Sequence, residues 1–217
     1  MVQRMAETVK RSYESPLRAQ AAGQTRRLIR SAAAQLFITR GVVASTVRQV
    51  AEQAGVSPRT VHVAFPGGKT QLFHEALNVA IGGDDADIPV ADRPQWQGIL
   101  DEPDGRRAIA LSVDFGAELL ERAGPLVMAG IESSGADPDM RRLADEGSDA
   151  TMANMRAFAR SLKRHGGLRD GLGVNEAAEI LYAMGSPHMH ELLRRRSGWS
   201  AQHYRRWLTE TLIAALH

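Results

Sequence analysis

The side chains best suited to chemistry lie between residues 46 and 69, where basic and hydroxyl groups alternate with apolar ones. Arginine presents a planar fork of donors that matches O6 and N7 of guanine, and lysine pairs with phosphate as a compact cation. Hydroxyl groups bond to backbone N–H groups or to phosphate oxygens. Together these residue types favour contact with a nucleic acid. The candidate contacts are Thr46, Arg48, Ser57, Pro58, Arg59, Thr60, His62 and Lys69.

Two short helices joined by a tight turn are predicted to position these groups. Apolar residues recur at helical spacing over residues 47–54, and a glycine follows where a helix-turn-helix bends sharply. Ser57 and Pro58 are typical of the N-cap and first position of a second helix. Val61 and Phe65 lie four residues apart and face the core. The opposite face of this helix is therefore available to a DNA major groove.

Some nearby side chains have two interpretations each. Arg18, Arg26 and Arg27 precede the two helices and either steer DNA, entering a minor groove, or lie on a solvated helix face. Val63 either touches the methyl group of a thymine or is buried against the rest of the protein. Thr46 either caps a helix only or also reaches a phosphate. The sequence leaves these alternatives open.

Charge is unevenly divided along the chain. Residues 1–81, called the head, hold 11 Lys and Arg against 4 Asp and Glu, whereas the other residues hold 16 against 21. A net charge of +7 followed by one of −5 indicates a polyanion-binding head on a mildly acidic remainder. Chance unevenness of a solvated surface is the alternative explanation.

Composition excludes several classes of protein. The 217 residues contain no cysteine, so disulfides and thiolate metal sites are excluded and a reducing compartment is expected. No apolar run approaches the roughly 20 residues of a membrane span, and the first residues lack a signal-peptide core. We therefore expect a cytoplasmic protein without a membrane partner.

The hydrophobic periodicity predicts an all-α protein, because every periodic segment is helical and none alternates as a strand does. A stretch rich in Gly, Pro and Asp separates the head from a larger helical body. The predicted divisions are a flexible or partly helical arm (1–22), a helix-turn-helix domain (23–68), a connecting helix (69–81), a linker (82–95) and the body, an effector-binding and dimerisation domain (96–217). The predicted helices outside the two short ones are 24–40, 69–81, 104–123, 125–133, 138–165, 175–184, 187–196 and 200–216.

A set of head residues stands in fixed order and spacing, and it carries a family resemblance. The set is Leu36, Phe37, Gly41, Ser45, Thr46, Val47, Val50, Ala51, Ala54, Gly55, Val56, Ser57, Thr60, Val61, Phe65, Lys69 and Leu72. It resembles the DNA-binding domain of the TetR family of one-component transcriptional regulators. The resemblance implies that Lys69 clamps a phosphate at the start of the connecting helix.

The head departs from the family pattern at three places. His62 stands where family members usually carry a tyrosine that touches a phosphate, and Ala64 stands where a histidine or tyrosine is frequent. Three residues, 66–68, separate Phe65 from Lys69, where the family usually has two. We therefore expect the contacts of His62 and the placement of Lys69 to differ from those of relatives.

The resemblance also implies a homodimer that binds a palindromic double-stranded DNA operator and releases it when the body binds a small-molecule effector. The sequence does not identify the effector. Most relatives repress; a transcriptional activator and an effector-independent or architectural DNA-binding protein are the alternatives. The residues expected to line the effector pocket are Trp96, Phe115, Met128, Met152, Met155, Phe158 and Tyr182. The residues expected at the dimer interface are Ile180, Leu181, Met184, Trp207, Leu208, Leu212 and Ala215. Both sets would serve equally well as the core of one chain.

Motifs of enzyme chemistry are incomplete in this sequence. Gly68, Lys69 and Thr70 resemble the end of a phosphate-binding loop, but valine stands at position 63, where that loop needs a glycine, and no strand precedes it. His188 and His190 have no further ligand at metal-binding spacing. No serine lies in a nucleophile elbow. We therefore expect no enzymatic activity, no metal and no cofactor.

Overall fold

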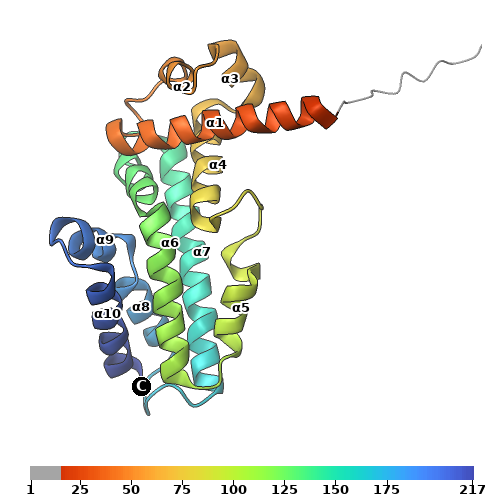
Figure 1. Ribbon diagram of the computed structural model, residues 1–217. Coiled ribbons are helices and arrows are strands. Elements are labelled where there is room, and N and C mark those ends of the chain that lie inside the picture. Colours follow the sequence, from red (N-terminus) through yellow and green to blue (C-terminus); the bar gives the residue numbers. More distant parts are fainter. Residues whose placement is uncertain (1–15) are drawn as a thin grey trace, which may run out of the picture.

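Four helices form the head. The computed structural model describes residues 16–217, with side chains from residue 18 onward, so most of the predicted N-terminal arm lies outside the described residues. The head helices are α1 (Pro16–Arg40), α2 (Val47–Ala54), α3 (Pro58–Ala64) and α4 (Gly68–Gly82). In Figure 1, α1 lies across one end of the molecule, α2 and α3 lie beyond it, and α4 runs from it toward the body.

Local chemistry explains where α2 and α3 begin and end. Thr46 and Gln49 form a capping box in which each side chain bonds to the other residue's backbone N–H. Gly55 ends α2 with a φ of 68°, a left-handed conformation that suits glycine. Ser57 accepts from the backbone N–H of Thr60, and a proline occupies the first position of α3. The predicted helix-turn-helix is present.

The body is a bundle built around two long helices. Its elements are η1 (Val90–Asp92), α5 (Pro94–Asp101), α6 (Gly105–Ser133), α7 (Pro138–Arg164), α8 (Val174–Met184), α9 (Pro187–His190), the π-helical turn η2 (Glu191–Arg196) and α10 (Ala201–Leu216). Figure 1 shows α6 and α7 running along the length of the molecule, with α5 on one flank and α8–α10 on the other. The described residues contain no strand, and the predicted all-α class is confirmed.

Helix α6 is longer than the sequence predicted, because the expected break beside Pro125 does not occur. Proline has no N–H and withdraws one hydrogen bond from the carbonyl of Glu121, four residues earlier. The helix continues because Ala123, Gly124 and Leu126 are all buried against neighbouring elements. Tertiary packing outweighs the local preference of proline at this position.

Arginine side chains form hydrogen bonds within and beside the segment predicted as a linker, residues 82–95. Arg93 is only 8% exposed, and its guanidinium donates to both carboxylate oxygens of Asp84 over 2.9 and 3.2 Å. This hydrogen-bonded pair holds the pKa of Asp84 below its usual range. Arg122 of α6 donates to the backbone carbonyl of Ile81 over 3.3 Å. The end of α4 is thereby fastened to the body.

The head and the body share part of their hydrophobic core. The cluster centred on Phe37, Phe65 and Phe73 also contains Leu126 of α6 and Met140 of α7. A Cβ atom added at position 130 of α6 would lie 2.6 Å from the ring of Phe73 on α4, so these two helices touch with no room for a side chain between them. A displacement of α6 would therefore press directly on α4.

None of the helices formed by the described residues is long and apolar enough to cross a membrane.

Candidate DNA-binding interface

The outer face of α3 carries three exposed side chains of different chemistry. Arg59, His62 and Val63 are all exposed, and His62 and Val63 follow Arg59 by three and four residues, so both lie beside Arg59 on the helix surface. Val61 is 1% exposed and Phe65 is fully buried, as their spacing predicted. The arrangement presents a cation, an imidazole and an aliphatic group side by side at the end of the molecule where α3 lies (Figure 1).

The hydroxyl groups among the predicted contacts act as helix caps. Thr46 accepts from the N–H of Gln49 over 3.2 Å, and Ser57 accepts from the N–H of Thr60 over 3.1 Å. The hydroxyls of Ser57 and Thr60 also lie 2.8 Å apart. Thr46 and Ser57 remain exposed, so a second partner can still reach them. Pro58, the first residue of α3, is exposed as well.

The two remaining candidate cations differ in how firmly they are held. Arg48 lies on the exposed side of α2, and the structure gives it no protein partner among the described residues. Lys69 is half-buried at the start of α4, and its ammonium group donates to the backbone carbonyl of Val43 over 3.3 Å. Lys69 is thus placed beside the loop that joins α1 to α2. Gly68 before it has a φ of 65°, which lets the longer loop turn into α4.

Arg26 faces the interior of the head. Its guanidinium pairs with Glu75 of α4 at 2.5 Å and lies over the ring of Phe65 at 4.3 Å from the centroid. It also donates to the carbonyl of Ala64, the last residue of α3. The interpretation of Arg26 as part of a solvated face is therefore wrong. Sequence spacing gave no sign of this because Glu75 lies far along the chain.

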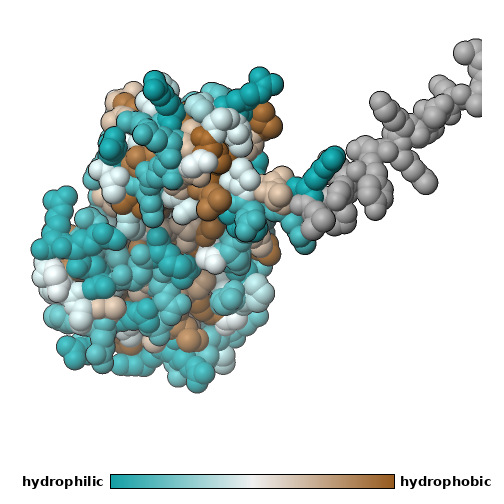
Figure 2. All heavy atoms as spheres, turned by 45° about the horizontal axis from the view of Figure 1, so that its top comes forward, coloured by the Kyte–Doolittle hydropathy of each residue, from teal (hydrophilic) through white to brown (hydrophobic). Residues whose placement is uncertain are grey.

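Apolar groups are part of the exposed surface of the head. Figure 2, which brings the top of Figure 1 forward, shows apolar areas among hydrophilic ones there. Val63 is 75% exposed and Val43 is 49% exposed. The interpretation of Val63 as buried against the rest of the protein is therefore wrong, and its side chain is open to a ligand.

Five of the seven predicted pocket residues lie in or beside the main core of the body, and Met128 and Tyr182 lie outside it. Trp96 and Phe158 are buried, and the ring of Trp96 lies 5.6 Å from that of Phe115 and 5.9 Å from that of Phe158, between centroids. The hydroxyl of Tyr182 lies 2.7 Å from that of Ser148 on α7. The remaining three predicted residues, Met128, Met152 and Met155, are half-buried.

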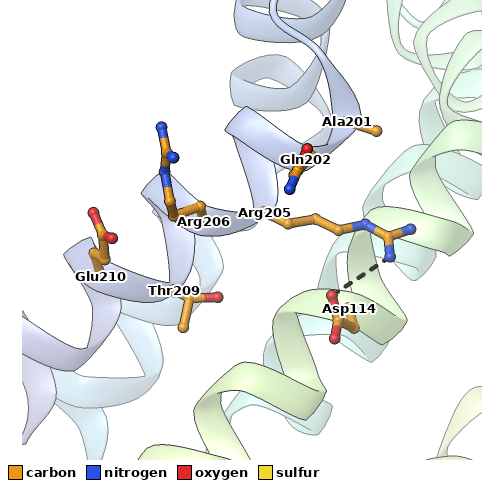
Figure 3. A pocket seen from close by; sticks show the side chains of 7 residues that line it. All are labelled: Asp114, Ala201, Gln202, Arg205, Arg206, Thr209 and Glu210. Carbon is orange, nitrogen blue, oxygen red and sulfur yellow. Dashed lines mark hydrogen bonds and ion pairs between the residues drawn. The ribbon is translucent and has the colours of Figure 1, made fainter.

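Among the hollows on the surface of the described residues are two that no predicted pocket residue lines. The larger, of about 650 Å³, lies between α6 and α10 (Figure 3), where Arg205 reaches toward Asp114 with Nη1 and Oδ1 3.5 Å apart. The smaller, of about 390 Å³, lies between α1 and α4, with Arg27 and Arg30 at its rim. Six of the seven residues that line the larger hollow are charged or polar, and none of them is aromatic. The effector pocket therefore stays a prediction.

The predicted dimer residues divide into two groups. Leu181, Leu208 and Leu212 are at most 4% exposed and belong to the core of the single chain, so for them the core interpretation is correct. They face α6 and α7 and offer almost no surface to a second copy. The other four are half-buried and lie on α8 and α10: Ile180, Met184, Trp207 and Ala215.

A buried polar cluster that the sequence did not indicate lies beside Pro125. His190 is 2% exposed, and its Nε2 atom lies 3.3 Å from the carboxylate of Glu121, which also binds Arg194 at 2.5 Å. Burial lowers the pKa of His190, and the hydrogen bond from Arg194 lowers that of Glu121. The neighbouring Tyr204 hydroxyl is buried, which raises its pKa to about 12.

Comparisons with known proteins agree on the family. Residues 29–76 match the family model described as "Bacterial regulatory proteins, tetR family". The search of curated proteins gave no match. The fold is similar to that of NalD, the secondary repressor of the MexAB-OprM multidrug efflux pump in Pseudomonas aeruginosa, with 20% identity, 90% of this chain and 97% of that chain covered, and a TM-score of 0.67.

Two further solved structures are similar over most of their length. PfmR from Thermus thermophilus is 20% identical, with coverage of 88% of this chain and 94% of that chain and a TM-score of 0.64. FadR from Bacillus subtilis, in complex with stearoyl-CoA, is 17% identical, with coverage of 88% and 99% and a TM-score of 0.68. Residues 29–76 therefore belong to a DNA-binding domain of the TetR family, and the described chain has the fold of these solved regulators.

Proposed function

We propose that the protein is a ligand-responsive repressor that binds a palindromic operator as a homodimer and releases it when a small molecule binds the body. The outer face of α3 is the observation that carries this proposal. A seven-residue helix with capped ends holds Arg59, His62 and Val63 outward, and these side chains match the acceptors and methyl groups of a major groove. NalD, which has a similar fold, is a repressor.

The contacts divide into those that read bases and those that bind the backbone. Arg59 reads a guanine, and Arg48 makes a second contact from α2. Thr46, Ser57 and Lys69 bind phosphates, because they lie at helix starts where N–H groups also point outward. Backbone contacts supply affinity without sequence information, so specificity depends on α3.

Dimerisation places two heads on one DNA duplex. The half-buried residues Ile180 and Met184 on α8, with Trp207 and Ala215 on α10, form the apolar part of the proposed interface. The buried leucines of the same helices support this surface from inside. Each head then meets one half-site of an inverted repeat.

Release follows from a shift between two conformations of the dimer. An effector that inserts among Trp96, Phe115 and Phe158 must separate these rings, whose centroids lie 5.6 and 5.9 Å apart, and so displaces α6 or α7. Helix α6 touches α4 at Phe73, so its displacement changes the spacing of the heads. The required coupling free energy is about 1–3 kcal/mol. FadR, which binds stearoyl-CoA, has a similar fold.

The test combines operator binding with release. Operator duplexes selected from random DNA are bound to the wild-type protein, and a compound library is screened for loss of binding by fluorescence anisotropy. A repressor also lowers transcription from a promoter that carries the operator. Binding without discrete sites would favour an architectural protein, and increased transcription would favour an activator.

A further inference from the structure

An ion pair joins α1 to α4 on the side of the head away from the exposed face of α3 that carries Arg59. Arg26 of α1 and Glu75 of α4 are held between helices, with side chains 38% and 23% exposed. The guanidinium donates to both carboxylate oxygens, at 3.2 Å from Nε and 2.5 Å from Nη2. Two-point pairs of this kind fix orientation as well as distance.

The same guanidinium contacts the last residues of α3, the proposed recognition helix. It donates to the carbonyl of Ala64, which ends α3, and lies 4.3 Å from the ring centroid of Phe65. Carbonyls at the end of a helix lack an internal partner, so a cation there supplies one. Arg26 therefore touches α3 and α4 at the same time.

Helix α3 depends on such outside contacts for its orientation. It has seven residues, and within it only Val61 is buried. A helix this short is not stable in isolation. Ser57 fixes its first turn, and Arg26 fixes its last.

The carboxylate of Glu75 also organises the loop between α3 and α4. Gln71 donates to Glu75 over 2.8 Å, and the side-chain oxygen of Gln71 accepts from the N–H of Gly67 over 2.8 Å. The loop with the additional residue is thus tied to the same carboxylate. A chain of contacts runs from Gly67 through Gln71 and Glu75 to Arg26 and the end of α3.

We propose that Arg26, oriented by Glu75, is a positioning residue that makes the recognition helix and α4 one rigid unit. A displacement of α4 then becomes a displacement of α3 and of its base-reading face. This inference rests on the proposed operator binding. A positioning role means that Arg26 contributes to the preference for the operator. A phosphate contact would instead mean that Arg26 contributes equally to the affinity for every sequence.

Variants at the pair separate these two roles. Anisotropy titrations compare the selected operator with a scrambled duplex of equal length over a range of KCl concentrations. We expect Arg26→Gln to weaken operator binding about tenfold, a value reduced for the partial exposure of the pair. Binding to the scrambled duplex stays within about twofold, and the slope of log K against log salt is unchanged, because no phosphate contact is lost.

Controls keep the test independent of folding. Glu75→Gln leaves the arginine charge in place and should give the same loss, and the double variant should lose no more than either single variant. Arg26→Lys keeps the charge and should not restore operator affinity. Arg27→Gln removes the adjacent exposed arginine and should leave the ratio of operator to scrambled binding intact. Faster amide exchange over residues 58–65 without DNA should accompany Arg26→Gln.

Three results would overturn the proposal: unchanged operator affinity in Arg26→Gln, equal weakening of both duplexes with a salt slope lower by about one, or additive losses in the double variant. Equal binding of both duplexes by the wild-type protein would instead reject operator recognition itself, so the two failures are distinguishable.

Discussion

At the scale of single residues, the face of α3 shows how three side chains divide recognition. Arg59 supplies paired donors, His62 a polar ring, and Val63 an aliphatic surface that is 75% exposed. Burial of this valine against a partner would stabilise a complex by about 25 cal/mol per Å² of apolar surface covered. The N-cap Ser57, which accepts from the backbone N–H of Thr60, holds the first turn of the helix that presents this face.

Arg59→Ala should relax base preference at one position of each half-site. The loss of a two-point contact to guanine removes about 1–3 kcal/mol of discrimination. Selection from random DNA with wild-type and variant protein measures it, and Arg59→Lys should retain affinity with reduced preference. An unchanged preference in Arg59→Ala would exclude a base contact.

Lys69→Ala should weaken binding to all sequences alike. Because Lys69 is proposed to bind a phosphate, the slope of log K against log salt should become shallower by about one. Titration of operator and scrambled duplexes at several salt concentrations gives this slope. Loss of specificity at constant slope would instead assign Lys69 to fixing the loop at Val43, whose carbonyl it contacts.

Val63 should contact the methyl group of a thymine. Replacing that thymine by uracil removes one methyl group, so wild-type binding should weaken about threefold to fourfold, at about 0.8 kcal/mol per buried carbon group. The Val63→Ala variant should bind both duplexes equally. Val43→Ala is the matched control for an exposed valine outside α3. Equal sensitivity of wild type and Val63→Ala to uracil would contradict the contact.

At the scale of elements, the sequence predicted helices well where caps and periodicity agree, as in α2 and α3. It was wrong at Pro125, because burial on both sides of the proline holds α6 together. It missed α5, which is short. In the head it could not predict the pairing of Arg26 with Glu75, because two residues 49 positions apart leave no periodic signal. The exposed candidate contacts could be predicted from the helical spacing of residues in the sequence, whereas contacts between packed helices could be found only in the structure.

The buried cluster beside Pro125 predicts a pH dependence of stability. Burial holds the pKa of His190 below its ordinary value of 6.5. The unfolded chain therefore binds a proton at higher pH than the folded one, and the free energy of unfolding declines as pH falls below 6.5. Urea unfolding between pH 7.5 and pH 5 measures the free energy of unfolding as a function of pH. The His190→Gln variant should lack the decline that the protonation of His190 causes. Glu121 affects stability at lower pH. Its pKa in the folded chain lies below the ordinary value of 4.5, so its contribution to the free energy of unfolding is lost as pH falls below 4.5.

At the scale of the whole molecule, the head and the body differ in net charge but are packed against each other. The head carries the net positive charge and the body the negative one, so a polyanion such as the proposed operator is attracted to the head. The head and the body are connected by a shared hydrophobic cluster and by the hydrogen bond from Arg122 of α6 to the end of α4. In the proposed function, a dimer with two heads uses these properties to recognise a symmetric site.

Selection of bound duplexes from random DNA tests the central proposal most directly. The account predicts enrichment of an inverted repeat whose half-sites lie about one helical turn, or a whole multiple of it, apart. Enrichment of a single unrepeated site, or of no sequence at all, would contradict a dimeric reader of a palindromic operator.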